Sequence, residues 1–264
     1  MLQSAINDLN PDEFLPMLSV VDQDEHISTI PRLHRDDRRF HWVFKNMEFK
    51  PWDCANSSQV LWLSGPSECN VDQVSSYLVG QEKHTALERD HLVLYFFFSA
   101  ATRGESTATF FVHTLLRQIV CCLPSDKSLL IIQSFLHSVL EDTFKNEAGL
   151  YWNKQGSNKS RSLAENVREI LGAPASELLT ALGAVLHEEQ QGLSIVVDGL
   201  DKVEYQRGDF VKGVRAFVEH LQQRTSKVKI LLTSRPQPDI KEVFNGLSCI
   251  EYDKERKGLV SPHI

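Results

Sequence analysis

The sequence predicts an α/β domain with a mostly parallel central sheet. Four short apolar segments, each of a length typical of a strand, alternate with longer segments in which apolar residues recur at helical spacing. Glycine or polar residues directly follow three of these four segments. Strands that alternate with helices in this way form parallel sheets covered by helices.

A helical segment is expected before the first strand, in residues 38–52 (RRFHWVFKNMEFKPW). Its apolar residues recur at helical spacing: Phe40, Val43, Phe44 and Met47. We expect Pro51 to end this helix and the polar residues 53–59 to form a loop.

The first strand is predicted at residues 60–64 (VLWLS), followed by a turn at Gly65. A helix is predicted over residues 71–79, because four apolar residues share one of its faces: Val71, Val74, Tyr77 and Leu78. Residues 91–100 (HLVLYFFFSA) are too few, and too rich in β-branched and aromatic side chains, for an isolated helix. They predict a strand that is buried on both faces.

Two further helices are predicted at residues 107–123 and 128–144, the first with Ser106 or Thr107 as its N-cap and Pro124 at its end. Residues 145–162 are polar and rich in Gly, Asn and Ser, so we interpret them as a surface insertion. Four elements complete the alternation: a helix at 175–191, a strand at 193–200, a helix at 211–225 and a strand at 228–236.

This pattern divides the chain into three parts. Residues 1–30, rich in Asp, Ser and Pro, are interpreted as a flexible or short-helical lead. Residues 31–250 form the predicted domain, and residues 251–264 form a C-terminal tail. No repeat of about 20 to 50 residues is visible, which argues against a solenoid or a propeller.

Composition excludes several classes of protein. A net charge of −7 and a pI near 5.8 argue against a nucleic-acid partner, because phosphate contacts need clustered Lys and Arg. The apolar runs are far shorter than the roughly 20 residues that span a bilayer, and the N-terminus has no secretion-signal pattern. We therefore expect no membrane partner and a cytoplasmic location. The five scattered cysteines form no CxxC pair, so they predict neither disulfides nor a zinc site.

The first functional signal lies directly after the first strand. A phosphate-binding loop follows the pattern G-x-x-x-x-G-K-[ST], in which backbone N–H groups surround the phosphates, lysine reaches their oxygens and the hydroxyl holds magnesium. The aligned residues here are Gly65, Pro66, Ser67, Glu68, Cys69, Asn70, Val71 and Asp72. The first glycine is present, whereas Asn70, Val71 and Asp72 replace the second glycine, the lysine and the hydroxyl residue.

These replacements change the chemistry of the loop. Asn tolerates a positive φ better than most residues, so Asn70 is expected to preserve the turn. Val71 cannot replace a cation. Glu68 and Asp72 would place carboxylates where a polyphosphate lies, with a repulsion comparable to the attraction of a lysine.

The second and third signals lie at the ends of two later strands. The strand of LSIVVDGLDKV ends in Asp198, as in a Walker B element, where the acid holds magnesium directly or through water. Asp201 would orient the attacking water, and Lys202 stands where a second acid is expected. The segment KILLTSRP would carry Thr233, Ser234 and Arg235 toward the same site, with Arg235 near the γ-phosphate. The alternatives are an ordinary Asp-Gly turn and a surface arginine.

Together, in this order and spacing, the three signals resemble the NACHT class of signalling P-loop NTPases, the STAND group. The similarity is greatest to fungal NACHT proteins and covers residues 31–245. It includes the segment 38–52 before LWLSG, then LYFFFSAATRGESTATFFVHTLLRQIV, IVVDGLDKV and ILLTSRP. The resemblance implies a P-loop NTPase-like three-layer sandwich.

The resemblance also implies function. In this class the domain binds ATP or dATP with magnesium, and exchange or hydrolysis switches a larger protein between closed and oligomeric forms. By position, Gly65–Asp72 would form the phosphate loop, Asp198 the magnesium acid, Asp201 the catalytic acid and Arg235 the sensor, with adenine near residues 40–49. The sequence departs from the class in its degenerate Walker A loop and shows no downstream winged-helix portion or repeats.

Two functions therefore compete. The first, which the residues favour, is a non-catalytic regulatory or protein-interaction module with no cofactor, whose partners are proteins, full-length NACHT relatives among them. The second is a STAND-type switch with weak residual ATP/Mg binding through Asp198, backbone N–H groups and Arg235. A decayed gene product is a third interpretation.

Overall fold

The computed structural model describes residues 6, 9–29, 38–54, 57–86, 91–99, 107–145, 162–188, 192–224 and 227–252. A five-stranded sheet in the order β2-β3-β4-β1-β5 lies at its centre, and every strand pair in it is parallel. The strands are β1 (Gln59–Ser64), β2 (His91–Phe97), β3 (Gly192–Asp198), β4 (Val228–Ser234) and β5 (Ser248–Glu251). The four predicted strands are all present, and β5 is an addition.

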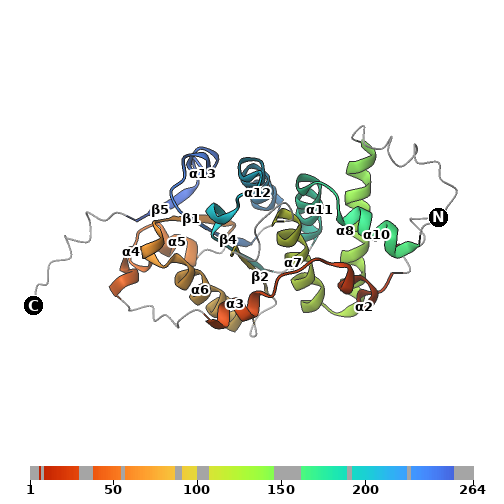
Figure 1. The fold of residues 1–264 in the computed structure, drawn as a ribbon. Coiled ribbons are helices and arrows are strands. Elements are labelled where there is room, and N and C mark those ends of the chain that lie inside the picture. Colours follow the sequence, from red (N-terminus) through yellow and green to blue (C-terminus); the bar gives the residue numbers. More distant parts are fainter. Residues whose placement is uncertain are drawn as a thin grey trace, which may run out of the picture.

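Helices cover the sheet on both sides (Figure 1). The α-helices are α2 (Pro11–Phe14), α3 (Gln23–Thr29), α4 (His41–Phe44), α5 (Phe49–Asp53), α6 (Val71–Ala86), α7 (Thr107–Cys122), α8 (Ser125–Lys145), α10 (Leu163–Leu171), α11 (Ala175–Glu188), α12 (Arg207–Arg224) and α13 (Pro238–Val243). The 3-10 helices are η1 (Leu15–Met17), η2 (Arg38–Phe40), η3 (Ser67–Cys69) and η5 (Leu200–Lys202).

The side chains of the strands divide between two cores. In β2, Leu94 and Phe96 join the core that also holds α7, α8, α11, α12 and α13. Val93 and Phe97 point the other way, into the core formed with α4, α5 and α6. The prediction that this strand is buried on both faces is therefore confirmed, as is the α/β three-layer fold class.

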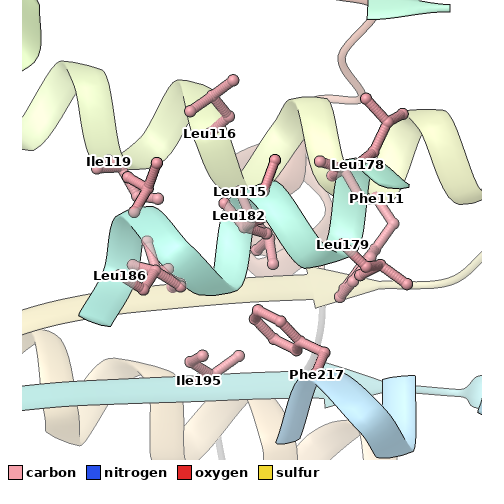
Figure 2. Packing of buried hydrophobic residues seen from close by; sticks show 14 of the residues in the cluster. Phe111, Leu115, Leu116, Ile119, Leu178, Leu179, Leu182, Leu186, Ile195 and Phe217 are labelled. Carbon is pink, nitrogen blue, oxygen red and sulfur yellow. The ribbon is translucent and has the colours of Figure 1, made fainter. Parts of the chain in front are cut away.

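The larger core is packed between α7, α11 and the sheet (Figure 2). Leu115 and Ile119 of α7 face Leu182 and Leu186 of α11, and Phe217 of α12 reaches the same layer above β3. Full burial of a side chain of this size contributes about 1.5–3 kcal/mol. Because each of these helices buries one apolar face in the core, its apolar residues recur at helical spacing, and this spacing predicted the helix.

The segment 38–52 differs from its prediction. Instead of one helix it forms η2 directly followed by α4, and then α5. Asn46 lies in the break between α4 and α5, where its side chain accepts a hydrogen bond from the N–H of Glu48 at 2.9 Å. Met47 at this turn is 86% exposed, so its assignment to the apolar face was wrong. Pro51 does not end a helix but lies in the first turn of α5, where a backbone N–H has no intrahelical acceptor.

Two α-helices and one strand were not predicted: α10, α13 and β5. Helix α10 begins with a capping box in which Ser162 and Glu165 bond to each other's backbone N–H groups, a sequence signal that was overlooked. The predicted insertion at 145–162 lies almost entirely outside the described residues, as do the N-cap candidate Ser106 and the tail beyond residue 252.

The N-terminal segment includes short helices, and its apolar side chains enter the larger core, with Phe14 fully buried. His113 of α7 holds this segment, since its Nδ1 accepts from the N–H of Ser19 at 3.0 Å and its Nε2 donates to the carbonyl of Leu171 at 3.1 Å. Burial lowers the pKa of His113 to about 4, so the neutral form that makes both bonds persists at neutral pH.

All five cysteines are free thiols. Among the described helices, none taken singly has the length and apolar composition to cross a bilayer; only the pair Leu163–Leu171 and Ala175–Leu186, bent by 100°, meets that test when joined.

A buried polar network lies at the amino-terminal ends of the central strands. The Glu82 carboxylate of α6 accepts from Ser194 Oγ at 2.7 Å and from Lys229 Nζ at 3.2 Å, and His91 Nε2 lies 2.8 Å from Ser194 Oγ. Burial by itself raises the pKa of Glu82, but the hydrogen bonds from His91 and Ser194 and the charge of Lys229 outweigh burial and lower it to about 2.

We predict that Glu82→Gln removes about 3 kcal/mol of stability at pH 7, which is what a pKa lowered from 4.5 to about 2 represents. The folded-state pKa lies below the unfolded one, so this contribution is complete above pH 4.5 and disappears as the pH falls toward 2. Denaturant unfolding of both proteins at pH 7 and pH 3 measures the effect. The exposed Glu242→Gln is the control, and a Glu82→Gln deficit equally large at both pH values would contradict the assignment.

Candidate functional site

A cavity of about 470 Å³ lies at the carboxyl ends of β1, β3 and β4. This is the edge of a parallel sheet at which ligands bind, beside the point where the strand order reverses. Most residues predicted for the site line this cavity: Gly65, Pro66, Ser67, Asn70, Val71, Asp72, Asp198, Asp201 and Arg235. The three signals found separately along the sequence therefore belong to one pocket.

Two residues of the predicted loop lie outside the lining of this cavity. Glu68 is exposed and is not among the residues that line it, so the expected repulsion between Glu68 and a phosphate has no support from its position. Cys69 is buried and turns inward: its Sγ would lie 3.3 Å from a Cβ placed on Gly65. Tyr252 approaches the same point to 3.2 Å, and both close contacts favour glycine at this position.

The loop keeps the backbone path of a turn into a helix. Residues 67–69 form η3, and Asn70 adopts φ 49° and ψ 49°, the left-handed conformation. Asn was expected to tolerate this geometry at the place of the second glycine, and it does. Val71 and Asp72 then open α6, so both lie in the turn whose N–H groups have no intrahelical acceptor.

Asp198 is the buried acid at the end of β3, with 2% of its surface exposed. Its Oδ1 accepts hydrogen bonds from Ser75 Oγ at 2.9 Å and from Thr233 Oγ1 at 2.8 Å. Its Oδ2 lies 3.6 Å from Nζ of Lys202, which forms an ion pair with it. Both carboxylate oxygens are therefore engaged with groups of the protein.

Asp201 and Arg235 are bound to each other. The Asp201 side chain accepts from the N–H of Arg235 at 2.8 Å and from Arg235 Nε at 2.6 Å. The Asp201 side chain is 4% exposed, whereas that of Arg235 is 51% exposed. The two residues assigned to water positioning and to phosphate sensing thus form one ion pair at the wall of the cavity.

Sequence reasoning assigned no site role to several residues of this site, Ser75 and Lys202 among them. Ser75 lies one turn after Val71 on the buried face of α6, and a lone hydroxyl on such a face was a signal that it has a polar partner. Lys202 was interpreted only as the residue that stands in place of an expected second acid, yet it lines the cavity. Residues 40–49, the expected adenine side, do not line this cavity; Phe44 packs against Phe49 and Tyr77 instead.

The residues do not fit a magnesium ion held by Asp198. Magnesium needs oxygen ligands, usually carboxylates and phosphates, in octahedral geometry. Here two hydroxyl donors and the Lys202 ammonium group already surround Asp198, and Asp72 replaces the hydroxyl residue of the loop. No group of three or more His, Cys, Asp or Glu side chains with metal-binding geometry occurs within the described ranges.

Comparison with known proteins identifies the family of this domain. The family model described as Nephrocystin 3, N-terminal, matches residues 39–235, which run from η2 to the end of β4 and include the whole phosphate loop. A comparison with curated proteins gave no match. The family match supports the NACHT-like character expected from the three motifs. Since the match spans most of its length, the chain belongs to the nephrocystin 3 N-terminal family, a group of NACHT-like domains.

Proposed function

We propose that this NACHT-like domain does not hydrolyse nucleotide and acts as a regulatory or protein-interaction module. The observation that carries the proposal is the pairing of Asp201, the acid assigned to orient water, with Arg235, which donates one hydrogen bond to each of its carboxylate oxygens. The two bonds fix the direction of the carboxylate and pair its charge with Arg235, so fewer of its lone pairs are available to align a nucleophile.

The phosphate loop supports the same proposal. Val71 stands at the lysine position and lines the cavity, so the loop itself supplies no side-chain cation to the β- and γ-phosphates. Loss of a charge-assisted contact of this kind costs about 1.5–3 kcal/mol. Asp72 adds a negative charge in the same turn. Stabilisation of transition-state charge, on which phosphoryl transfer depends, is therefore weak on this side of the pocket.

A domain without turnover influences other molecules through contact. We propose that its partners are proteins, full-length NACHT relatives among them, and that it acts in the cytoplasm without nucleic-acid or membrane contact.

We predict that the purified domain forms a complex with a full-length NACHT protein of the same cell. Sedimentation of the two proteins alone and mixed measures the association, with a faster boundary expected for the mixture. Independent sedimentation at micromolar concentrations would contradict this part of the proposal.

A nucleotide-binding switch is the second candidate function. Two cationic side chains line the cavity, Lys202 and Arg235, and these favour retention of a phosphate group. A switch requires that ATP and ADP bind with different affinities, because only differential binding shifts a conformational equilibrium. Calorimetric titration with each nucleotide in the presence of magnesium tests this function, and equal affinities would exclude it.

We predict no ATP or GTP turnover above that of Asp201→Asn, because Asp201 is already engaged by Arg235. Phosphate release over hours at micromolar protein and millimolar Mg·ATP measures this. Melting curves establish that both proteins are folded. Turnover by the natural chain that Asp201→Asn abolishes would refute the proposal.

We predict that Asp201 and Arg235 are energetically coupled by about 1–2 kcal/mol, a range lowered by the exposure of the arginine. Denaturant unfolding of the natural chain, Asp201→Asn, Arg235→Gln and the double variant forms the cycle. The nearby pair of Arg207 and Asp239, at 2.8 Å and more exposed at its acid, serves as the reference cycle. Additive effects of the two single variants would show that the pair is not formed in solution.

A further inference from the structure

We infer that Lys202 makes this cavity a metal-independent phosphate site, in which its ammonium group takes the place of both the loop lysine and the magnesium ion. The ligand class is a phosphate group, either of an inorganic polyphosphate or of a nucleotide. The inference rests on the proposed function, because phosphoryl transfer at such a site depends on the divalent ion that Lys202 replaces.

The position of Lys202 follows from the turn after β3. Gly199 has φ 78°, and the N–H of Lys202 donates to the carbonyl of Gly199 at 2.8 Å. This turn folds the lysine side chain back over Gly199, so that a Cβ added there would lie 2.9 Å from Lys202 Cδ and 3.0 Å from Nζ. The missing side chain of Gly199 thus provides the path by which the lysine reaches the cavity.

The Lys202 ammonium group is held by Asp198 and is still able to bind a phosphate group. Its 3.6 Å separation from Asp198 Oδ2 is an ion pair but exceeds the length of a direct hydrogen bond. An ammonium group has three donors, and the Lys202 side chain is 37% exposed at the cavity. Because Ser75 and Thr233 already satisfy Oδ1 of Asp198, a small movement of Lys202 toward a ligand leaves that acid hydrogen-bonded.

The charges of the cavity lining largely offset one another, since three acids and two cations line it. The ion pair with Asp198 offsets the charge of that acid, and the ion pair with Arg235 offsets that of Asp201. Asp72 is the remaining acid among the residues that line the cavity. The N–H groups and the dipole at the first turn of the 16-residue helix α6 attract anions, and they therefore offset the negative charge of Asp72.

The same geometry disfavours magnesium. A divalent ion next to Asp198 would lie within a few ångströms of the Lys202 ammonium group, and like charges at that distance repel strongly. Phosphate binding and magnesium binding therefore compete here, whereas in a P-loop with a magnesium site they support each other. We expect affinity for phosphate to be unchanged or reduced when magnesium is added.

The test is calorimetric titration of the whole chain with pyrophosphate, tripolyphosphate and ATP, first in EDTA and then in excess MgCl₂. Saturable binding in EDTA is expected, with about tenfold weaker binding for Lys202→Gln and near-natural binding for Lys202→Arg. Lys212→Gln is the control, since Lys212 lies on α12, is 70% exposed and does not line the cavity. Similar affinities for tripolyphosphate and ATP identify a polyphosphate site, and tighter ATP binding identifies a nucleotide site.

Three results would overturn the inference: no saturation up to millimolar ligand, binding that requires magnesium, or equal affinity of Lys202→Gln and the natural chain. Melting curves of each variant show whether it is folded, and Lys202→Arg keeps the comparison valid if the glutamine variant is unstable. ATP hydrolysis is measured separately, as phosphate release. Hydrolysis would refute the proposed function, whereas a negative titration in EDTA would refute only the role of Lys202.

Discussion

The buried carboxylate of Asp198 is the constraint on which the arrangement of the site depends. A charge with 2% exposure must be compensated by hydrogen bonds or ion pairs, since its desolvation otherwise costs several kcal/mol. The compensating groups come from α6, through Ser75, and from β4, through Thr233. Thr233 also accepts from the N–H of Gly199, so one network fixes the turn after β3 against the neighbouring strand.

This network explains how the pocket keeps its shape although the phosphate loop has lost its characteristic residues. The position of α6 depends mainly on its buried residues, and none of these occupies a position that contacts phosphate in the loop pattern: Val74, Ser75, Leu78, Val79 and Glu82. Val71 and Asp72 can therefore replace lysine and a hydroxyl residue without moving the helix. The loop can therefore lose its phosphate-binding side chains while the helix keeps its position, because different residues of α6 serve the two purposes.

The sequence was sufficient for most of the fold and for the location of the site. The strands were predictable because β1 to β4 are continuous apolar runs buried on both faces, and the location followed because parallel strands end at one edge. Strand β5 was not predictable, since its four residues show neither an apolar run nor alternation and are fixed by pairing with β1. Met47 was misplaced because a local side-chain bond from Asn46 prevailed over helical periodicity.

The interactions within the site were less predictable, because they depend on which charged groups meet. Asp201 and Arg235 are 34 positions apart and were assigned separate roles, although each becomes the other's partner once β3 and β4 are adjacent. A sequence motif likewise does not show in which direction a long side chain points. The pattern DGLDK shows a lysine after two acids, but only the left-handed turn at Gly199 brings its ammonium group back to Asp198.

The two ends of the sheet carry different polar networks, and both of them hold helix α6. Glu82 and its partners lie at the amino-terminal ends of the strands, where burial and a strongly lowered pKa make the network important for stability. Asp198 and its partners lie at the carboxyl ends, beside the cavity. Both networks bind α6 to the sheet, one through Glu82 and the other through Ser75. Helix α6 is therefore fixed to the sheet near both of its ends, so its position does not depend on the residues that the phosphate loop places at its first turn.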